Sequence, residues 1–520
     1  MSASSLRAPC AGALARARGA GHPAGCCREW RRRIEAKSIR QIRQRARQQE
    51  DATSKRRSPW LDLDRDRDPL SLENGNRVAV VGGGPAGALF ATFLRQLAEL
   101  VGLDVAVDVF EPRRFDRAGP AGCNHCGGVV SESLVQMLAA EGIEIPAGII
   151  QRGIDSYVLH LDVGTVRIDP PGREKRIAAV YRGNGPRDGR IGDAVGFDRY
   201  LLELAAERGA RVEPRLVTDL GWSAGRPRVV CGDGFAADYD LLVLASGVNS
   251  NLLAAAERLG VGFRAPASVR TFITEFHLGR EAVERALGAS MHVFLLDLPN
   301  LEFGALIPKG DFVTACLLGR RIDDDLVRSF LAAPEVRSCF PGGVLPPACC
   351  HCFPRINVGP RGPAWGDRVV MIGDSGVTRL YKDGIGAAYR TAKSAATTAV
   401  LQGVSAKSFA RHYGGACRRI DRDNAIGKFL FACGHAVQHA RFSRRVLLRM
   451  TRAEQSAARS PRLLSSILWD LFTGSSSYRD ILERGLRPSF AGGLLRHAVA
   501  GGWRDPAPAA AIPAGRSSHA

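Results

Sequence analysis

The sequence contains no run of about 18 apolar residues, the approximate length that a helix needs to cross the apolar part of a bilayer. It also lacks a clear secretory signal, so its 13 cysteines are expected to remain reduced thiols. Neither zinc-finger spacing nor an RNA-recognition motif occurs, and nucleic acid is therefore not expected as a partner. These absences favour a cytoplasmic location, with peripheral contact to a membrane as an open alternative.

The positive charge of the chain is concentrated in two segments. Of the net charge of +20 over 520 residues, residues 1–57 contribute +11 and residues 407–462 contribute +10. The remainder is close to neutral. Basic segments suit anionic lipid headgroups or nucleic acid, but runs of charge are more often simply solvated. We therefore expect solvated charge on an N-terminal arm and on a late helical segment.

Hydrophobic periodicity predicts an α/β protein whose two main domains are interleaved along the chain. Residues 1–75 lack a sustained apolar period and are predicted to form a disordered basic arm. The predicted Rossmann-like, dinucleotide-binding domain comprises residues 76–148, 190–262 and 362–400, and the sheet-rich α+β substrate domain comprises residues 149–189 and 263–361. Residues 401–520 are predicted to form a helical C-terminal region that ends in a flexible tail.

A glycine-rich turn follows the first predicted strand, Arg77–Val81, and opens a helix. In the spacing Gly82-x-Gly84-x-x-Gly87, the first glycine permits a tight turn, the second lets the backbone approach a pyrophosphate, and the third lets helix and strand pack closely. The helix N-terminus adds partial positive charge. Glu111 ends the next strand, 24 residues beyond Gly87, where a carboxylate can accept hydrogen bonds from ribose hydroxyls. The predicted dinucleotide contacts are therefore Gly82, Gly84, Pro85, Ala86, Gly87 and Glu111.

Two later segments resemble those of a known group of proteins. Residues 240–250 read DLLVLASGVNS, and residues 367–375 read DRVVMIGDS and are followed by DGIGAA at 383–388. They resemble group A flavoprotein hydroxylases and geranylgeranyl reductases, and this resemblance implies FAD, with Asp374 on the ribityl chain and a helix that opens toward the flavin pyrimidine. A helix dipole stabilises negative charge on a reduced flavin. The contacts that the resemblance implies are Gly373, Asp374, Gly384, Ile385, Gly386 and Ala387.

A cysteine-containing segment, residues 123–131, reads CNHCGGVVS. It resembles the Cys-Gly-Gly segment of geranylgeranyl reductases, which implies that Cys126 lies near the isoalloxazine and the substrate. Cys123 and Cys126 also form a C-x-x-C pair, so a redox dithiol beside the flavin stays open. A buried, unreactive thiol ranks second. A metal or iron–sulfur site in which the pair and His125 join the Cys349-Cys350-His351-Cys352 cluster ranks last, because adjacent side chains of one strand cannot all point the same way. We predict no metal ligands.

Three further segments give weaker signals. Tyr381 and Lys382 lie between the ribityl aspartate and the flavin-facing helix, and either is expected to deliver a proton or to hold substrate. Loop anchoring through an Arg379–Asp383 pair is the alternative. Arg190 precedes a predicted helix in an arrangement that resembles one near the cofactor in this superfamily. Residues 303–310 retain little of the Tyr-x-Trp-x-Phe-Pro motif of geranylgeranyl reductases and lack both tryptophans of the related halogenase segment.

The resemblance implies an FAD-dependent reductase or dehydrogenase that transfers hydride at flavin N5 to or from an apolar, lipid or isoprenoid-like substrate. NAD(P)H is a candidate electron donor, although no second glycine motif for it occurs, and no redox partner protein is indicated. An NAD(P)H- and O₂-dependent flavin monooxygenase is the first alternative. A basic protein that binds membranes or nucleic acid through a vestigial flavin fold is an alternative of another class.

Overall fold

The computed structural model describes residues 68–115, 117–119, 127–171, 177–186, 196–457 and 462–500. Most of the predicted basic arm therefore lies outside the described residues. Its last part does not behave as an arm: Leu72 is buried in the core, and the Asp68 carboxylate accepts hydrogen bonds from the hydroxyls of Ser405 and Ser408. The folded body therefore begins before the predicted boundary at residue 75. The sequence does not show this, because contacts between such a short segment and a distant part of the chain leave no periodic pattern.

A six-stranded sheet with the order β20-β21-β12-β1-β2-β8 forms the first lobe. The five strands from β21 to β8 are parallel, and β20 pairs antiparallel at one edge. The central strands are continuous apolar runs because both faces of a parallel sheet are covered. The strands are β1 (Asn76–Val81), β2 (Val105–Phe110), β8 (Arg211–Glu213), β12 (Leu241–Leu244), β20 (Trp365–Gly366) and β21 (Val369–Met371).

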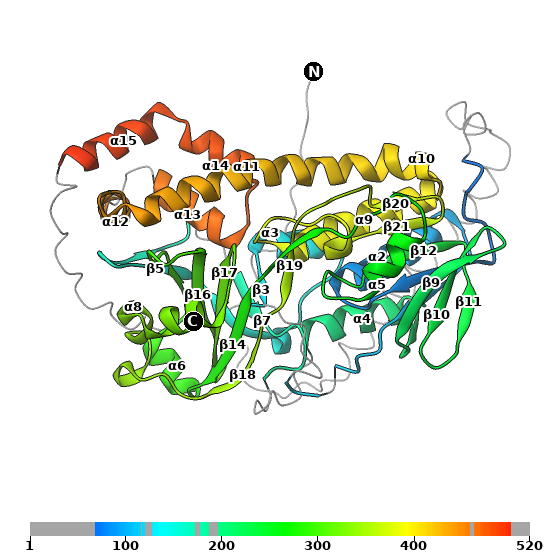
Figure 1. Ribbon diagram of the computed structural model, residues 1–520, viewed down its shortest axis with the longest axis horizontal. Coiled ribbons are helices and arrows are strands. Elements are labelled where there is room, and N and C mark those ends of the chain that lie inside the picture. Colours follow the sequence, from blue (N-terminus) through cyan, green and yellow to red (C-terminus); the bar gives the residue numbers. More distant parts are fainter. Residues whose placement is uncertain are drawn as a thin grey trace, which may run out of the picture. The chain divides into compact units, whose positions relative to one another are not determined.

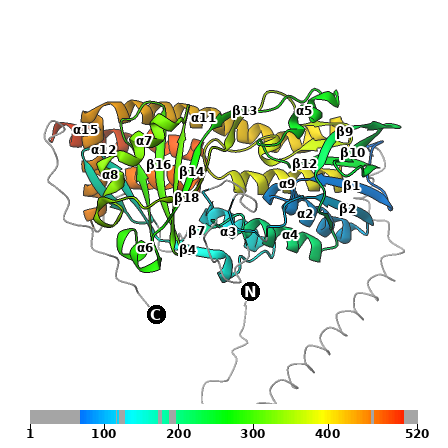
Figure 2. The ribbon, with the colours of Figure 1, turned by 60° about the horizontal axis from the view of Figure 1, so that its bottom comes forward.

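Helices α2 (Pro85–Val101), α4 (Phe197–Glu207) and α9 (Gly384–Leu401) pack together in this lobe. Figure 2 shows α2 and α9 side by side. Helix α2 begins at Pro85, because the fixed backbone angle of proline suits the first helical position. It ends at Gly102, whose left-handed conformation terminates the helix. These caps place the N-terminus of α2 directly after the turn that follows β1.

A seven-stranded sheet with the order β18-β14-β17-β16-β15-β5-β6 forms the second lobe. Its side chains alternate between two separate apolar cores, one on each face. Helices α6 (Arg280–Ala286), α7 (Asp324–Ala332) and α8 (Pro334–Arg337) contribute to the core on one face. The strands are β5 (Ser156–Leu161), β6 (Gly164–Ile168), β14 (Phe272–His277), β15 (Ser290–Phe294), β16 (Leu301–Lys309), β17 (Phe312–Gly319) and β18 (Ala348–Cys352).

The C-terminal helices cover the other face of the seven-stranded sheet (Figure 1). Trp469 is fully buried, and its ring lies edge-on to Tyr157 of β5, with ring centroids 4.9 Å apart. The predicted helical C-terminal region thus covers one face of the sheet in the second lobe. Every helix among the described residues is too short or too polar to cross a bilayer. The C-terminal helices are α11 (Gly414–His439), α12 (Arg441–Ser456), α13 (Leu463–Thr473), α14 (Tyr478–Gly485) and α15 (Pro488–Val499).

Smaller sheets complete the fold. Strand β8 of the six-stranded sheet is followed closely by β9 (Val217–Ser223), which belongs to one of these small sheets. Pro214 lies between them, and proline lacks the N–H that a continuous ladder needs. The other small-sheet strands are β3 (Val129–Val130), β4 (Ile150–Ile154), β7 (Ile177–Val180), β10 (Arg226–Cys231), β11 (Ala236–Asp238), β13 (Ala267–Arg270) and β19 (Arg355–Gly359). The predicted fold class is confirmed.

Candidate functional site

The carboxyl ends of four parallel strands open into one cavity of about 690 Å³. Gly82 follows β1, Glu111 follows β2, Ser246 follows β12, and Asp374 follows β21, and all four line this cavity. Parallel α/β sheets bind their ligands outside the carboxyl ends of the strands. The cavity therefore lies where the fold places a ligand, and it extends from there toward the seven-stranded sheet.

The three glycines of the first turn are held by different constraints. Gly82 has a φ of +108°, and a Cβ atom there would lie 2.5 Å from the Ala245 carbonyl oxygen. A Cβ atom on Gly87 would lie 1.9 Å from the carbonyl oxygen of Gly82, so this glycine is required for helix and strand to pack. At Gly84 the nearest atom to a Cβ would be an Arg182 nitrogen at 3.5 Å, an ordinary contact. The protein itself thus tolerates a side chain at Gly84, which faces the cavity.

Glu111 is buried at the end of β2 and is held in place by the main chain. One carboxylate oxygen accepts a hydrogen bond from the Gly83 N–H at 2.9 Å, and the other accepts from the Arg113 N–H at 3.0 Å. Burial raises the pKa of Glu111, while these two hydrogen bonds oppose the rise. Each oxygen keeps a further lone pair for a ligand in the cavity.

An arginine that sequence reasoning did not select lines the cavity beside Gly84. Arg182 forms a two-point contact with the fully buried Asp198, with its Nε 2.9 Å from one carboxylate oxygen and its Nη 2.6 Å from the other. The paired geometry fixes the guanidinium in place. The hydroxyl of Ser246 also lines the cavity and is buried without a hydrogen-bond partner among the described residues.

Asp374 lies in a short 3₁₀ turn after β21. Its main-chain oxygen accepts a hydrogen bond from the Asn357 side-chain amide at 3.1 Å, and the same amide donates to the Gly376 oxygen at 3.0 Å. The turn is therefore fixed independently of the Asp374 carboxylate. Burial raises the pKa of this carboxyl group, while a hydrogen bond from the Thr378 side chain and the positive charge of Arg182 oppose the rise.

The N-terminus of α9 also reaches the cavity through Gly384 and Ile385. Asp383 precedes the helix with a φ of +56°, and its carboxylate lies 2.9 Å from Arg390 and 3.5 Å from Arg379. The anticipated Arg379–Asp383 pair therefore exists. A Cβ atom on Gly386 would overlap the Asp383 carboxylate at 2.1 Å, so this glycine packs inside the turn.

Three C-terminal helices brace the loop that joins Asp374 to α9. The side-chain amide of Asn424 on α11 donates to the Thr378 oxygen at 2.8 Å, and its oxygen accepts from the Leu380 N–H at 2.8 Å. Arg379 donates to the main-chain oxygens of Gly474 and Ser476, between α13 and α14. The Tyr478 hydroxyl, on α14, donates to the Leu380 oxygen. This loop is thus held by contacts from helices far away in sequence.

Lys382 and Tyr381 lie at the end of the cavity that is formed by the seven-stranded sheet. The Lys382 Nζ lies 4.0 Å from the centre of the Phe303 ring, and burial lowers the pKa of Lys382 to about 7. Burial raises the pKa of Tyr381 to about 12, and its ring packs edge-on to Phe431 of α11 at 4.9 Å. This end of the cavity is mainly apolar; its lining includes Met291, Phe303, Ala305, Ile307, Cys316, Leu318 and Phe472.

The structure brings most of the predicted site residues together, although they come from segments nearly 300 residues apart. Ten of them line the cavity: Gly82, Gly84, Pro85, Ala86, Glu111, Asp374, Tyr381, Lys382, Gly384 and Ile385. Four others do not line the cavity but are small, closely packed residues next to it in sequence: Gly87, Gly373, Gly386 and Ala387. Cys126 and Arg190 lie outside the described residues, as do Cys123 and His125.

Several cavity residues were not anticipated from the sequence. Arg182 has a local signal, since it precedes the helix that carries its partner Asp198. Phe472 and Thr473 belong to α13, where the sequence shows no motif, and only the tertiary fold brings them to the cavity. The cysteines of residues 349–352 lie on the edge strand β18, and the other half of the alternative metal site is outside the described residues.

No protein-family model matches the chain, and no curated protein matches its sequence. Its fold is similar to solved structures. A geranylgeranyl bacteriochlorophyll reductase-like protein from Thermoplasma acidophilum is 14% identical and aligns over 82% of this chain and 100% of that chain, with a TM-score of 0.56. The halogenase PltM, in complex with phloroglucinol and FAD, is 14% identical over 82% of this chain and 91% of that chain, with a TM-score of 0.51.

A flavoprotein/dehydrogenase from Cytophaga hutchinsonii is also 14% identical, and it aligns over 82% of this chain and 98% of that chain with a TM-score of 0.51. At these identities the likeness establishes the fold alone. The chain therefore has the fold shared by a geranylgeranyl reductase-like protein, a flavin-containing halogenase and a flavoprotein dehydrogenase, as the sequence resemblance predicted.

Proposed function

We propose that the chain binds FAD in this cavity and is an FAD-dependent oxidoreductase that acts on an apolar substrate. The observation that carries the proposal is the continuity of the cavity. It joins the glycine turn and Glu111 to Asp374, to the N-terminus of α9 and then to an apolar end that contains Lys382. Its volume of about 690 Å³ lies within the range of ligand pockets, roughly 300–1,000 Å³.

The residues present fit FAD. Gly84 faces the cavity at a position where the protein would accept a Cβ atom, so its missing side chain leaves room for a ligand. The buried hydroxyl of Ser246 lacks a partner among the described residues, and burying such a group is costly unless a ligand satisfies it. Arg182 contributes a fixed positive charge next to Gly84, where a phosphate would sit.

Each residue has a distinct task in this proposal. Glu111 accepts hydrogen bonds from the ribose, and the N-terminus of α2 with Arg182 holds the pyrophosphate. Asp374 accepts hydrogen bonds from the ribityl chain, and the free N–H groups at the start of α9 contact the pyrimidine. Bound FAD would supply two-electron chemistry, exchanging hydride with a substrate carbon at N5.

Lys382 is proposed to move the proton that accompanies hydride transfer. Its pKa of about 7 means that the protonated and neutral forms are both populated at neutral pH. The apolar side chains around it exclude water and favour a hydrocarbon-like substrate. We therefore propose a reductase or dehydrogenase as the leading function, in which the ammonium form of Lys382 donates its proton when the substrate is reduced.

A monooxygenase that uses NAD(P)H and O₂ is the second candidate, because a flavin-containing halogenase shares the fold. The two differ in their use of oxygen. Purified protein is incubated with NADPH or NADH, and oxygen consumption is recorded with and without a lipid extract of the producing cells. A reductase gives substrate-dependent oxidation of the nicotinamide under argon. Turnover that requires O₂ and stops under argon contradicts the reductase proposal.

A further inference from the structure

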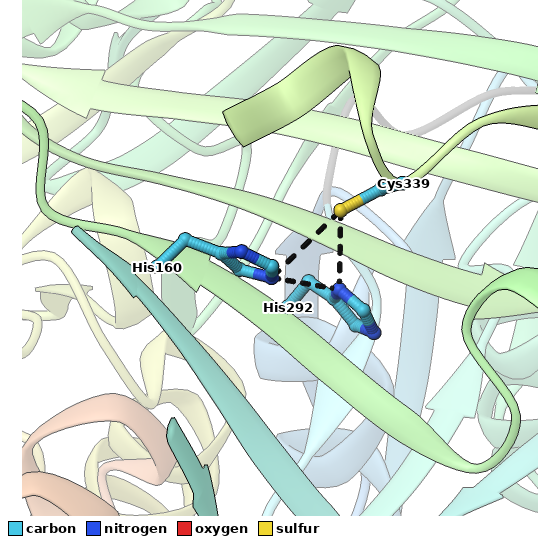
Figure 3. A group of neighbouring side chains, drawn as sticks. All are labelled: His160, His292 and Cys339. Carbon is cyan, nitrogen blue, oxygen red and sulfur yellow. Dashed lines mark hydrogen bonds between the residues drawn. The ribbon is translucent and has the colours of Figure 1, made fainter. Parts of the chain in front are cut away.

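Two histidines and a cysteine meet in the core on the face of the seven-stranded sheet that carries α6, α7 and α8 (Figure 3). His160 belongs to β5 and His292 to the neighbouring parallel strand β15. The register pairs His292 with Val158, two residues from His160, so both imidazoles project from the same face. Cys339 follows α8 and points its sulfur at both rings.

The three ligand atoms form a compact triangle. The His160 Nε2 lies 2.9 Å from the His292 Nδ1, which lies 3.3 Å from the Cys339 Sγ, and the remaining side is 3.7 Å. A tetrahedral ion about 2.0 Å from two imidazole nitrogens and about 2.3 Å from a thiolate holds these atoms roughly 3.3–3.6 Å apart. The triangle thus matches one face of a metal tetrahedron to within a few tenths of an ångström.

Both imidazoles have further partners that orient them. The Nδ1 atom of His160 lies 3.3 Å from the Thr165 hydroxyl, and His292 also hydrogen-bonds the main chain of Leu287. Such outer hydrogen bonds commonly fix the orientation of metal-binding histidines.

The surroundings are apolar. The ring of His160 stacks on Phe294, with centroids 4.6 Å apart and planes 14° from parallel. The Cys339 side chain is 4% exposed. Polar groups in such a core are costly unless each has a strong partner. The competing arrangement is a metal-free trio, in which the two histidines share one proton and the thiol donates to the Glu335 carbonyl oxygen at 3.5 Å.

We propose that His160, His292 and Cys339 bind one transition-metal ion that favours imidazole and thiolate ligands, with Zn²⁺ as the ion to test. Two neutral imidazoles and one thiolate supply three positions, and water supplies the fourth. Binding breaks the Cys339 S–H bond and releases its proton to solvent. The site joins α8 to the sheet on the face away from the cavity, and it does not depend on FAD binding.

The test uses full-length protein purified without a metal-affinity step. Elemental analysis is expected to give about one equivalent of zinc, or of cobalt after exchange. X-ray absorption of this wild-type protein is expected to show one sulfur and two imidazole ligands, with a metal–sulfur distance of about 2.3 Å. This measurement separates the site from any metal held by the cysteines of residues 349–352, which would give several sulfur ligands.

Variants supply the second arm of the test. Cys339→Ala and His292→Ala are expected to lose the equivalent of metal and to unfold several degrees earlier, while they retain their flavin. Cys231→Ala removes another buried thiol, on β10, and is expected to keep the metal. A wild-type protein that takes up neither ion, a sulfur-rich ligand set, or a Cys339→Ala protein with full metal content would overturn the proposal.

Discussion

Asp374 is the side chain on which the proposed ribityl contact depends. Its turn is held through its main-chain oxygen by Asn357, so removing the carboxylate leaves the backbone intact. A hydrogen bond to a charged group contributes about 1.5–3 kcal/mol. We therefore expect Asp374→Ala to weaken FAD binding roughly 10- to 100-fold, as measured by quenching of flavin fluorescence. Glu99→Ala, on the exposed side of α2, should bind FAD as the wild type does. Equal FAD affinities for both variants would show that the Asp374 carboxylate does not contact the cofactor.

Lys382 makes the proposed chemistry dependent on pH. Because burial lowers its pKa to about 7, the proton-donating form disappears as the pH rises through that value. Substrate reduction should therefore decline above pH 7, and Lys382→Met should lower kcat by roughly 100-fold or more and abolish this decline. Tyr381→Phe keeps the ring that packs on Phe431 and tests the other predicted residue, while Arg422→Ala, at an exposed position of α11, serves as the control. A full-activity Lys382→Met enzyme with normal FAD content would exclude Lys382 from proton transfer.

Among the structural elements, the turn between β1 and α2 contains one glycine that leaves room for a ligand and another that folding requires. A Cβ atom at Gly84 meets only ordinary contacts, whereas one at Gly87 would lie 1.9 Å from a main-chain oxygen. Gly84→Val should accordingly fold with a near-normal melting temperature but lose FAD, because its side chain occupies the cavity. Gly87→Ala should lose stability by several kcal/mol. Thermal melts and flavin content of the two purified variants check this, and an FAD-loaded Gly84→Val protein would contradict it.

The brace on the loop before α9 connects the C-terminal helices to the cavity. Asn424→Ala leaves the buried Thr378 oxygen and Leu380 N–H without their partner, at a cost of about 2–4 kcal/mol. We expect a lower unfolding midpoint in urea together with faster loss of FAD on dilution. Arg422→Ala changes an exposed position of the same helix and should change neither property. Loss of stability without any change in FAD retention would show that the brace does not reach the cavity.

In the whole molecule, local sequence patterns predicted secondary-structure elements more reliably than they predicted tertiary contacts. The strand, the glycine turn and Glu111 were identifiable because the residues that form this unit are close in sequence. Phe472 and the His160–His292–Cys339 cluster have no such signal, since each depends on segments brought together by the tertiary fold. Peripheral membrane contact stays a prediction. Co-sedimentation with anionic liposomes of the full chain and of a variant lacking residues 1–67, which keeps the buried Leu72, would test it.

The absorbance spectrum of the purified protein, recorded before and after denaturation, shows directly whether FAD occupies the cavity. We expect a flavin spectrum, with close to one FAD released for each chain or bound after FAD is added to a colourless preparation. The released cofactor should be identified as FAD by mass. A correctly folded protein that stays colourless and takes up no FAD at micromolar concentrations would show that the cavity is not an FAD site.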